Sequence, residues 1–169
     1  EAGATLNIEE GVKIISIYDN IVDYILVKQG AKINAVGTPD KPIVMTSEKE
    51  EPGAWGGIHI CGKAHTNAEG GKGSSEIGGA VYGGNDDADN SGTLQYIRLE
   101  YTGFAFDEEH EANGISFYGV GNGTIVDHCE AYKGSDDGFE FFGGSVNVSN
   151  MVVVSCSDDS FDWTEGWNG

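Results

Sequence analysis

The sequence is poor in basic residues and contains no long apolar run. It has 9 lysines and arginines against 28 acidic residues, a formal net charge of −19, and Arg98 is its only arginine. Because almost nothing is available to neutralise a row of phosphates, this composition excludes a nucleic-acid partner and disfavours an anionic membrane surface. No run approaches the ~20 apolar residues of a membrane-spanning helix, so we expect no transmembrane segment.

Cysteine and proline are also scarce, with three residues of each. Cys61, Cys129 and Cys156 form no Cys-x-x-Cys pair, which excludes the common zinc, redox and haem-attachment motifs. We expect them to be buried thiols that line the core. The alternative is one disulfide with a thiol left over, in an oxidising compartment, and the sequence does not select a pair.

The chain is rich in glycine, with 27 residues, and it repeats itself. The motif Ser135–Phe141 returns 22 residues later as Ser157–Trp163, and a fainter copy spans Asn113–Tyr118. Repeats of this length are typical of solenoids, in which each copy is one coil stacked on the previous one. The 22-residue spacing predicts two stacked aromatic columns: Phe117, Phe139 and Phe161, and Phe141 with Trp163.

The N-terminal part has its own weaker repeat. The segment Gly3–Ile8 matches Gly30–Ala35, 27 residues later, and both alternate apolar with polar residues, as strands with one buried face do. Ile97–Leu99 aligns with Cys129–Ala131 at an offset of 32. The remaining expected strands are Val12–Ile17, Ile25–Lys28, Ile43–Thr46, Gly57–Cys61, Tyr96–Tyr101, Thr124–Ala131 and Val148–Val154.

The sequence therefore predicts one all-β domain over residues 1–169, a right-handed parallel β-helix (β-solenoid) of about six or seven coils. Two loop insertions are expected, at about 62–90 and 104–111, because both stretches are polar and lack strand periodicity. The segment Gly166–Gly169 is typical of a coil cut open. We therefore expect the chain to be a segment of, or continuous with, further coils.

Several of these segments resemble a known family. Gly3–Val12, Gly30–Val44 and Trp55–Ile58 resemble right-handed parallel β-helix surface proteins of the pectin-lyase-like superfamily. Gly134–Gly144 and Phe161–Trp167 are similar to a bacterial subgroup of secreted or lipid-anchored β-helix proteins whose activity is not assigned. The resemblance implies the β-helix fold and an extracellular or cell-surface location, and it implies little about activity.

The duplicated acidic segments are the one candidate site. Equivalent residues of stacked coils lie roughly 4.8 Å apart, where carboxylates repel by about 3–4 kcal/mol per pair at an effective dielectric near 20. Such a row must be separated, protonated, given amide donors or bridged by a cation, and Ca²⁺ suits carboxylate and carbonyl oxygens best. The alternative is a pair of turns that accept their own backbone amides. The candidate ligands are Asp136, Asp137, Glu140, Asp158, Asp159, Asp162 and Glu165.

A weaker candidate is the segment Asp86–Asn90, in which Asp86, Asp87 and Asp89 give the alternating oxygens of a calcium loop. It lacks the glycine and the terminal glutamate of an EF-hand loop, so a solvated loop is the alternative.

The sequence favours an extracellular structural or adhesive module without catalytic residues, stabilised by calcium and able to associate head to tail into fibres. The alternative is a polysaccharide-active enzyme, a lyase or a glycoside hydrolase, or a glycan-binding module. Asp136 and Asp137 resemble the paired aspartates of polygalacturonases, but that family's His-Gly and Arg-x-Lys elements are absent. Arg98 is distant in sequence from the duplicated motif, which leaves Lys133 as the nearest base for a lyase.

Overall fold

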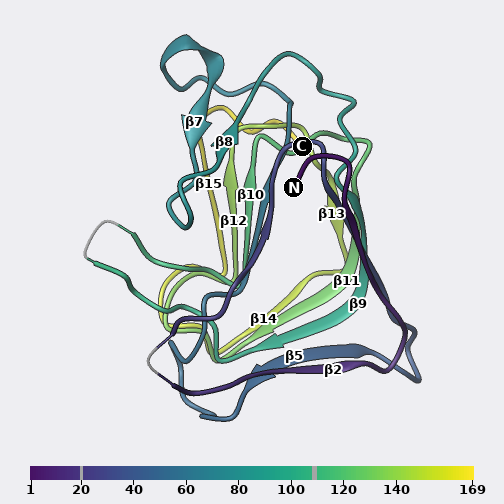
Figure 1. The fold of residues 1–169 in the computed structure, drawn as a ribbon, viewed down its shortest axis with the longest axis vertical. Coiled ribbons are helices and arrows are strands. Elements are labelled where there is room, and N and C mark those ends of the chain that lie inside the picture. The colour runs from purple at the N-terminus through teal and green to yellow at the C-terminus, as the bar shows by residue number, and fades with distance from the viewer. Residues whose placement is uncertain (20, 108–109) are drawn as a thin grey trace.

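The computed structural model describes residues 1–19, 21–107 and 110–169. Within these residues the chain is almost entirely strand, with no α-helix and a single 3₁₀ turn, η1 (Glu69–Gly71). Seen along the stack, successive coils overlie one another, and their strands form two parallel sheets on different sides of a shared core (Figure 1). The prediction of an all-β parallel β-helix is confirmed.

The larger sheet, here called sheet A, has eight strands, and each of its pairings is parallel. Its strand order follows the coils, because a parallel partner one coil away is the only neighbour that a solenoid offers. The strands are β1 (Thr5–Ile8), β2 (Lys13–Ser16), β4 (Lys32–Val36), β5 (Ile43–Ser47), β9 (Gly92–Glu100), β11 (Ile125–Tyr132), β13 (Val148–Ser149) and β14 (Val152–Val154).

The smaller sheet, sheet B, has five parallel strands in the order β15-β12-β10-β6-β3. Its central strands are buried on both faces, because the core covers one face and a long excursion of the chain covers part of the other. The strands are β3 (Ile25–Val27), β6 (Ile58–Cys61), β10 (Ile115–Tyr118), β12 (Phe139–Phe142) and β15 (Phe161–Thr164).

The registers confirm most of the predicted repeats and correct one. Thr5 pairs with Lys32 and Ile97 with Cys129, which are the predicted offsets of 27 and 32, and Phe139 pairs with Phe161. The predicted alignment of Phe117 with Phe139 is wrong. Phe117 pairs with Phe141 instead, 24 residues on, because the coil between β10 and β12 is two residues longer than the next coil.

The aromatic columns follow this corrected register. Phe117 stacks on Phe141 with ring centroids 5.0 Å apart, and Phe139 stacks on Phe161 at 5.7 Å. Trp163 pairs with Phe141 in the β-ladder but is 62% exposed, and the ring that stacks on Phe141, at 4.5 Å, belongs to Trp167. The expected stacking of Trp163 on Phe141 is thus replaced by Trp167, whose indole N–H donates to the Val146 carbonyl.

Sheet A bends where residues other than glycine take a positive φ. Tyr96, His128 and Asn150 have φ of 50°, 52° and 52°, and they occupy equivalent positions of three coils. Left-handed backbone costs free energy at residues other than glycine. Contacts between the side chains of neighbouring coils offset this cost. The Tyr96 and His128 rings stack at 4.5 Å, and the Asn150 amide donates to Asp127 Oδ1 at 2.8 Å.

The two insertions lie beside sheet B. The first, at about 62–90, contains the antiparallel hairpin β7 (Gly73–Ser74) and β8 (Val81–Tyr82), which projects from the stack in Figure 1. The second, at about 104–111, includes the bridge between Ala105 and Glu111, and its residues 108 and 109 lie outside the described residues.

The three cysteines are free thiols, and no disulfide joins them. The expectation of buried thiols is confirmed for Cys61 and Cys129 and is wrong for Cys156, which is only partly buried. Cys61 and Cys129 are buried, and burial raises the pKa of each thiol, to about 11 and about 12. In the part of the chain that the structure describes, no helix has the length and apolar character that crossing a membrane requires.

Candidate metal centre

Carboxylates gather where two successive coils turn into sheet B. Asp136 and Asp137 lie in the turn before β12, and Asp158 lies in the equivalent turn before β15. Glu140 and Asp162 are directly paired on β12 and β15, on the sheet face that points away from the core. The parallel register therefore places acidic residues of one coil against acidic residues of the next.

These five residues form two groups that share Asp137. One group is Asp136, Asp137 and Asp158, and the other is Asp137, Glu140 and Asp162. In each group one carboxylate oxygen per residue lies within 4.8 Å of the others. Two further predicted ligands, Asp159 and Glu165, belong to neither group.

The groups have few hydrogen-bond donors. The Asp159 backbone N–H donates to Asp137 Oδ1 at 2.8 Å, and the Trp163 N–H donates to Asp162 Oδ1 at 2.8 Å. In the ranges 1–19, 21–107 and 110–169, no lysine or arginine forms an ion pair with any of the five carboxylates. The amide donors satisfy single oxygens and leave the mutual repulsion of the carboxylates in place.

Burial and this repulsion raise the pKa values of carboxylates in the cluster. Desolvation raises the pKa of Asp136 to about 6 and that of Asp137 to about 7, and neighbouring carboxylates act in the same direction. Burial, helped by the charges of Glu76 and Asp137, raises the pKa of Glu140 to about 9. Asp136, Asp137 and Glu140 on one coil interact with Asp158 and Asp162 on the next, so a cation that replaces the protons gains several charged oxygens at once.

An asparagine that the sequence analysis did not single out adjoins the second group. Asn113 is 1% exposed, and its Nδ2 donates to Glu140 Oε2 at 2.6 Å and to Ser116 Oγ at 3.0 Å. Its Oδ1 is buried and has no hydrogen-bond partner among the described residues. The corrected offset of 24 identifies it, because Asn113 precedes β10 as Asp137 precedes β12.

Glu76 is a second residue that the sequence did not indicate. It lies in the 62–90 excursion, half-buried, and the Tyr118 hydroxyl donates to its Oε2 at a long 3.4 Å. Burial raises the pKa of Glu76 to about 7, and the charge of Asp136 adds to that shift. No repeat could reveal this residue, because the excursion belongs to one coil alone.

Glu165 has a different environment from the other predicted ligands. Its carboxylate accepts hydrogen bonds from the Tyr82 hydroxyl, at 3.0 Å to each oxygen, and from Thr66 Oγ1 at 2.5 Å. These hydrogen bonds join the turn that follows β15, the last strand of sheet B along the chain, to the excursion. Glu165 therefore has a structural role in fixing the excursion.

The weaker aspartate segment is not assembled into a group. Asp87 accepts from the backbone N–H of His65 at 3.0 Å and from its ring Nδ1 at 2.7 Å, which lowers the pKa of Asp87. Asp89 accepts from Ser91 Oγ at 3.2 Å. Asp86 is exposed, and these three residues are not among the two groups formed by described residues.

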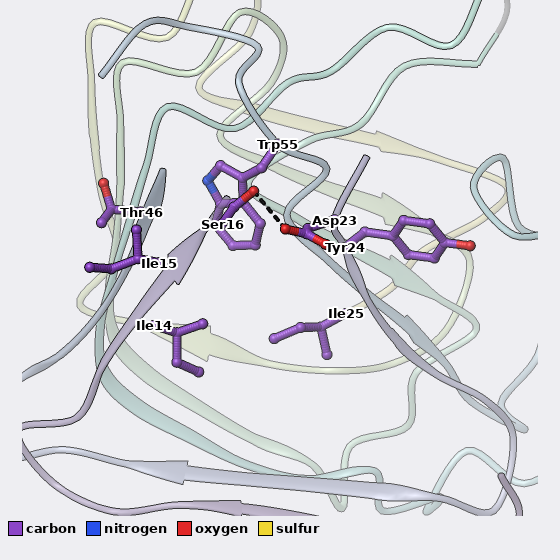
Figure 2. A pocket seen from close by; sticks show the side chains of 8 residues that line it. All are labelled: Ile14, Ile15, Ser16, Asp23, Tyr24, Ile25, Thr46 and Trp55. Atoms are coloured by element: carbon purple, nitrogen blue, oxygen red, sulfur yellow. Dashed lines mark hydrogen bonds between the residues drawn. The ribbon is translucent and has the colours of Figure 1, made fainter. Parts of the chain in front are cut away.

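A hollow elsewhere in the fold has a different character. It has a volume of about 100 Å³ and lies between β2 and β3 over Trp55 (Figure 2). Its one carboxylate, Asp23, already accepts from Ser16 Oγ at 3.0 Å and from the Ile17 N–H. This hollow is mainly apolar, and Figure 2 shows Ile14 and Ile25 among its side chains.

Among the described residues, the two cations considered for the lyase alternative lie away from these carboxylates. Arg98 lies on β9 of sheet A, where its Nε pairs with Glu100 at 2.7 Å and its guanidinium lies 4.4 Å from the centre of the Tyr132 ring. Lys133 also lies over the Tyr132 ring, at 5.1 Å. Neither cation is directed to the carboxylate groups.

Comparison with known proteins adds the family to this geometry. No curated protein and no solved structure matches the chain. A family model described as a pectate-lyase-like beta helix domain matches residues 1–169. The parallel coils and the whole-length match agree, and the chain belongs to the pectate-lyase-like beta helix domain family.

Proposed function

We propose that the chain is a calcium-binding, non-catalytic β-helix module of a secreted or cell-surface protein, with a structural or adhesive role. The observation that carries the proposal is the position of Asp137, which belongs to both carboxylate groups and links two coils. Ca²⁺ accepts six to eight oxygens at 2.3–2.6 Å in flexible geometry, so it can combine carboxylates, turn carbonyls and water. A cation there would replace the repulsion between coils by attraction.

The chemistry of the donor set favours Ca²⁺ over other metals. The groups offer oxygen ligands only, since no histidine or cysteine belongs to either of the two groups formed by described residues. Hard cations prefer such ligands, whereas zinc and copper prefer nitrogen and sulfur. Mg²⁺ requires near-ideal octahedral geometry, which unevenly placed carboxylates on two coils suit less well.

The test is a calcium titration of EDTA-treated protein by calorimetry, with melting followed in parallel. Extracellular calcium modules have Kd values of about 10⁻⁴–10⁻³ M. At a hundred times Kd, binding to the folded state alone adds about 2.7 kcal/mol, which raises the Tm of a domain of this size by roughly 5–10 °C. Mg²⁺ serves as the matched control. No heat of binding, together with a Tm that neither Ca²⁺ nor EDTA changes, would overturn the proposal.

Self-association would extend both sheets without a new fold. The strands β3 and β15 each have a single partner in sheet B among the described residues, so a second copy stacked head to tail could pair with either. We include this association in the proposed structural role. Analytical ultracentrifugation over a range of concentrations, with electron microscopy of the same samples, would reveal fibres, and a monomer at all concentrations would exclude them.

A glycoside hydrolase is the second candidate, and one observation favours it. Burial raises the pKa of Glu140 to about 9 and that of Asp136 to about 6, which separates a proton donor from a carboxylate that ionises earlier. Activity on a panel of polysaccharides that disappears in both Asp136→Asn and Glu140→Gln would establish hydrolysis and refute the non-catalytic role.

A further inference from the structure

A tight turn fixes Glu76 in the excursion. The Ser75 hydroxyl donates to the Ile77 carbonyl at 2.8 Å and accepts from the Ala80 N–H at 2.9 Å. Ile77, immediately after Glu76, is 2% exposed, so a buried side chain anchors the turn. The backbone of Glu76 thus has little freedom to turn away.

The excursion packs against the outer face of sheet B beside this turn. The Tyr82 and Tyr118 rings lie 5.2 Å apart, and Ala80 and Phe142 belong to the same buried cluster. This contact joins the hairpin β7–β8 to sheet B, beside which the hairpin projects from the stack in Figure 1. The packing brings the Glu76 side chain to the face of the sheet on which Glu140 lies.

Glu76 meets other negative charges there. Its carboxylate interacts electrostatically with Asp136 and Glu140, and with Glu111 from the second insertion. His110 is the favourable charge among its neighbours, and the long bond from Tyr118 is weak for a half-buried carboxylate. Apolar packing, together with the hydrogen bonds from Thr66 and Tyr82 to Glu165, therefore holds the excursion on the stack against this charge repulsion.

An independent observation indicates that a ligand belongs beside these carboxylates. Asn113 is 1% exposed and contacts Glu140 through Nδ2, yet its buried Oδ1 has no partner among the described residues. Leaving an amide oxygen buried and unpaired is costly. Amide and carboxylate oxygens are both ligands of Ca²⁺, so one cation would satisfy Asn113 and the carboxylates together.

We propose that Glu76 closes the calcium site from the side of the excursion, binding the cation through its bound water, so that calcium fastens the excursion to the stack. This inference rests on the calcium binding proposed above. Glu76 lies outside the group of Asp137, Glu140 and Asp162 itself, and it supplies a further carboxylate from the excursion to the surroundings of that group. The cation then joins two coils and the excursion, and the excursion becomes the part of the molecule that responds to calcium.

The experiment compares Glu76→Gln with Glu69→Gln, which removes an exposed carboxylate from the same excursion. Calcium affinity is measured by calorimetry, and hydrogen exchange of residues 73–82 is measured with calcium and with EDTA. In the wild type and in Glu69→Gln, we expect calcium to slow exchange of this segment. In Glu76→Gln, we expect roughly tenfold weaker affinity, and the protection by calcium should be lost.

The outcomes separate this inference from the proposed function. A wild-type protein that binds no calcium refutes both. Calcium binding with unchanged affinity and unchanged protection in Glu76→Gln refutes the role of Glu76 alone. Glu76→Asp provides the test if the glutamine variant does not fold, because it keeps the charge and withdraws the carboxylate by one methylene group. Glu76→Asp should also lose calcium affinity and the protection of residues 73–82 by calcium. Wild-type values of both in Glu76→Asp would refute the role of Glu76 in the site.

Discussion

The Asp159 backbone N–H donates to Asp137 Oδ1 at 2.8 Å, and this bond joins two coils 22 residues apart in sequence. Asp137 is 8% exposed, and among the described residues it is the carboxylate shared by both groups. One of its oxygens thus has an amide donor that fixes the side chain. The rest of its charge faces other carboxylates, which makes Asp137 the residue whose substitution tests the site most directly.

Asp137→Asn should weaken calcium binding at least about tenfold, because both groups lose a charged ligand at once. The asparagine oxygen can still accept from the Asp159 N–H, so the turn should keep its shape. In EDTA the variant should melt at or above the wild-type temperature, because a repelling charge has gone. Calorimetry and melting curves check the two statements.

The control for this variant is Asp40→Asn, an exposed aspartate in the turn between Thr38 and Lys41 on sheet A. It changes the net charge equally and lies on another sheet, so it should leave calcium affinity unchanged. Equal loss of affinity in both variants would mean that calcium responds to overall charge and has no defined site.

Glu140 should make the calcium-free protein less stable as the pH rises. Burial raises the pKa of Glu140 from 4.5 to about 9, so the folded state keeps a proton that the unfolded chain releases at lower pH. The unfolded state then binds fewer protons, and stability falls as pH rises from about 4.5 towards 9. Asp137, whose pKa is raised to about 7, acts in the same direction.

Glu140→Gln removes the largest of these contributions. Between pH 5 and pH 8, in EDTA, the variant should retain about 1–2 kcal/mol of stability that the wild type loses, after discounting for partial exposure of the carboxyl. Urea unfolding at several pH values measures this difference. Parallel pH profiles for variant and wild type would show that the Glu140 carboxyl does not carry the shift.

The sequence predicted the convergence of the carboxylates better than it predicted the register beside them. Of the seven strongest candidates, five converge, because the repeat of Ser135–Phe141 as Ser157–Trp163 is a true coil offset of 22. The alignment of Phe117 with Phe139 failed because the preceding coil is two residues longer, and a weak motif cannot reveal a two-residue insertion. Asn113 was missed for the same reason.

Glu76 was missed for a different reason. Its position depends on how the excursion folds back, through the contact of Tyr82 with Tyr118 and the turn around Ser75. These contacts join residues that share no repeat and no periodicity. Coil-to-coil neighbours follow from counting residues once the offset is known, whereas the neighbours of an insertion follow from side-chain packing.

Phe141→Ala should be among the most destabilising substitutions in the fold. Phe141 is 1% exposed and lies between Phe117 and Trp167, with ring centroids 5.0 and 4.5 Å away. Removing the ring leaves a cavity and ends the column, at a cost of about 3–5 kcal/mol. Urea unfolding measures it, and Phe141→Leu should cost less than half as much. A loss below about 1 kcal/mol for alanine, roughly that of burying one methylene group, would contradict a packed column.

Gly92 is the glycine on which the contact between β4 and β9 depends. Its φ is +120°, and a Cβ there would lie within 2.0 Å of the Ile33 carbonyl oxygen, which is backbone and cannot rotate away. Gly92→Ala therefore combines backbone strain with separation of two paired strands. Gly79 also has a positive φ, of +57°, but a Cβ there meets nothing nearer than 3.8 Å.

Comparing substitutions at Gly79 and Gly92 therefore separates the cost of left-handed backbone from the cost of separating the paired strands. Gly79→Ala should lose about 1 kcal/mol of stability, the cost of left-handed backbone alone. Gly92→Ala should lose at least twice as much, because the Ile33–Gly92 pairing must open as well. Urea unfolding of both variants gives the comparison. Equal losses would mean that β9 can shift away from β4 at no cost, which close packing of successive coils does not allow.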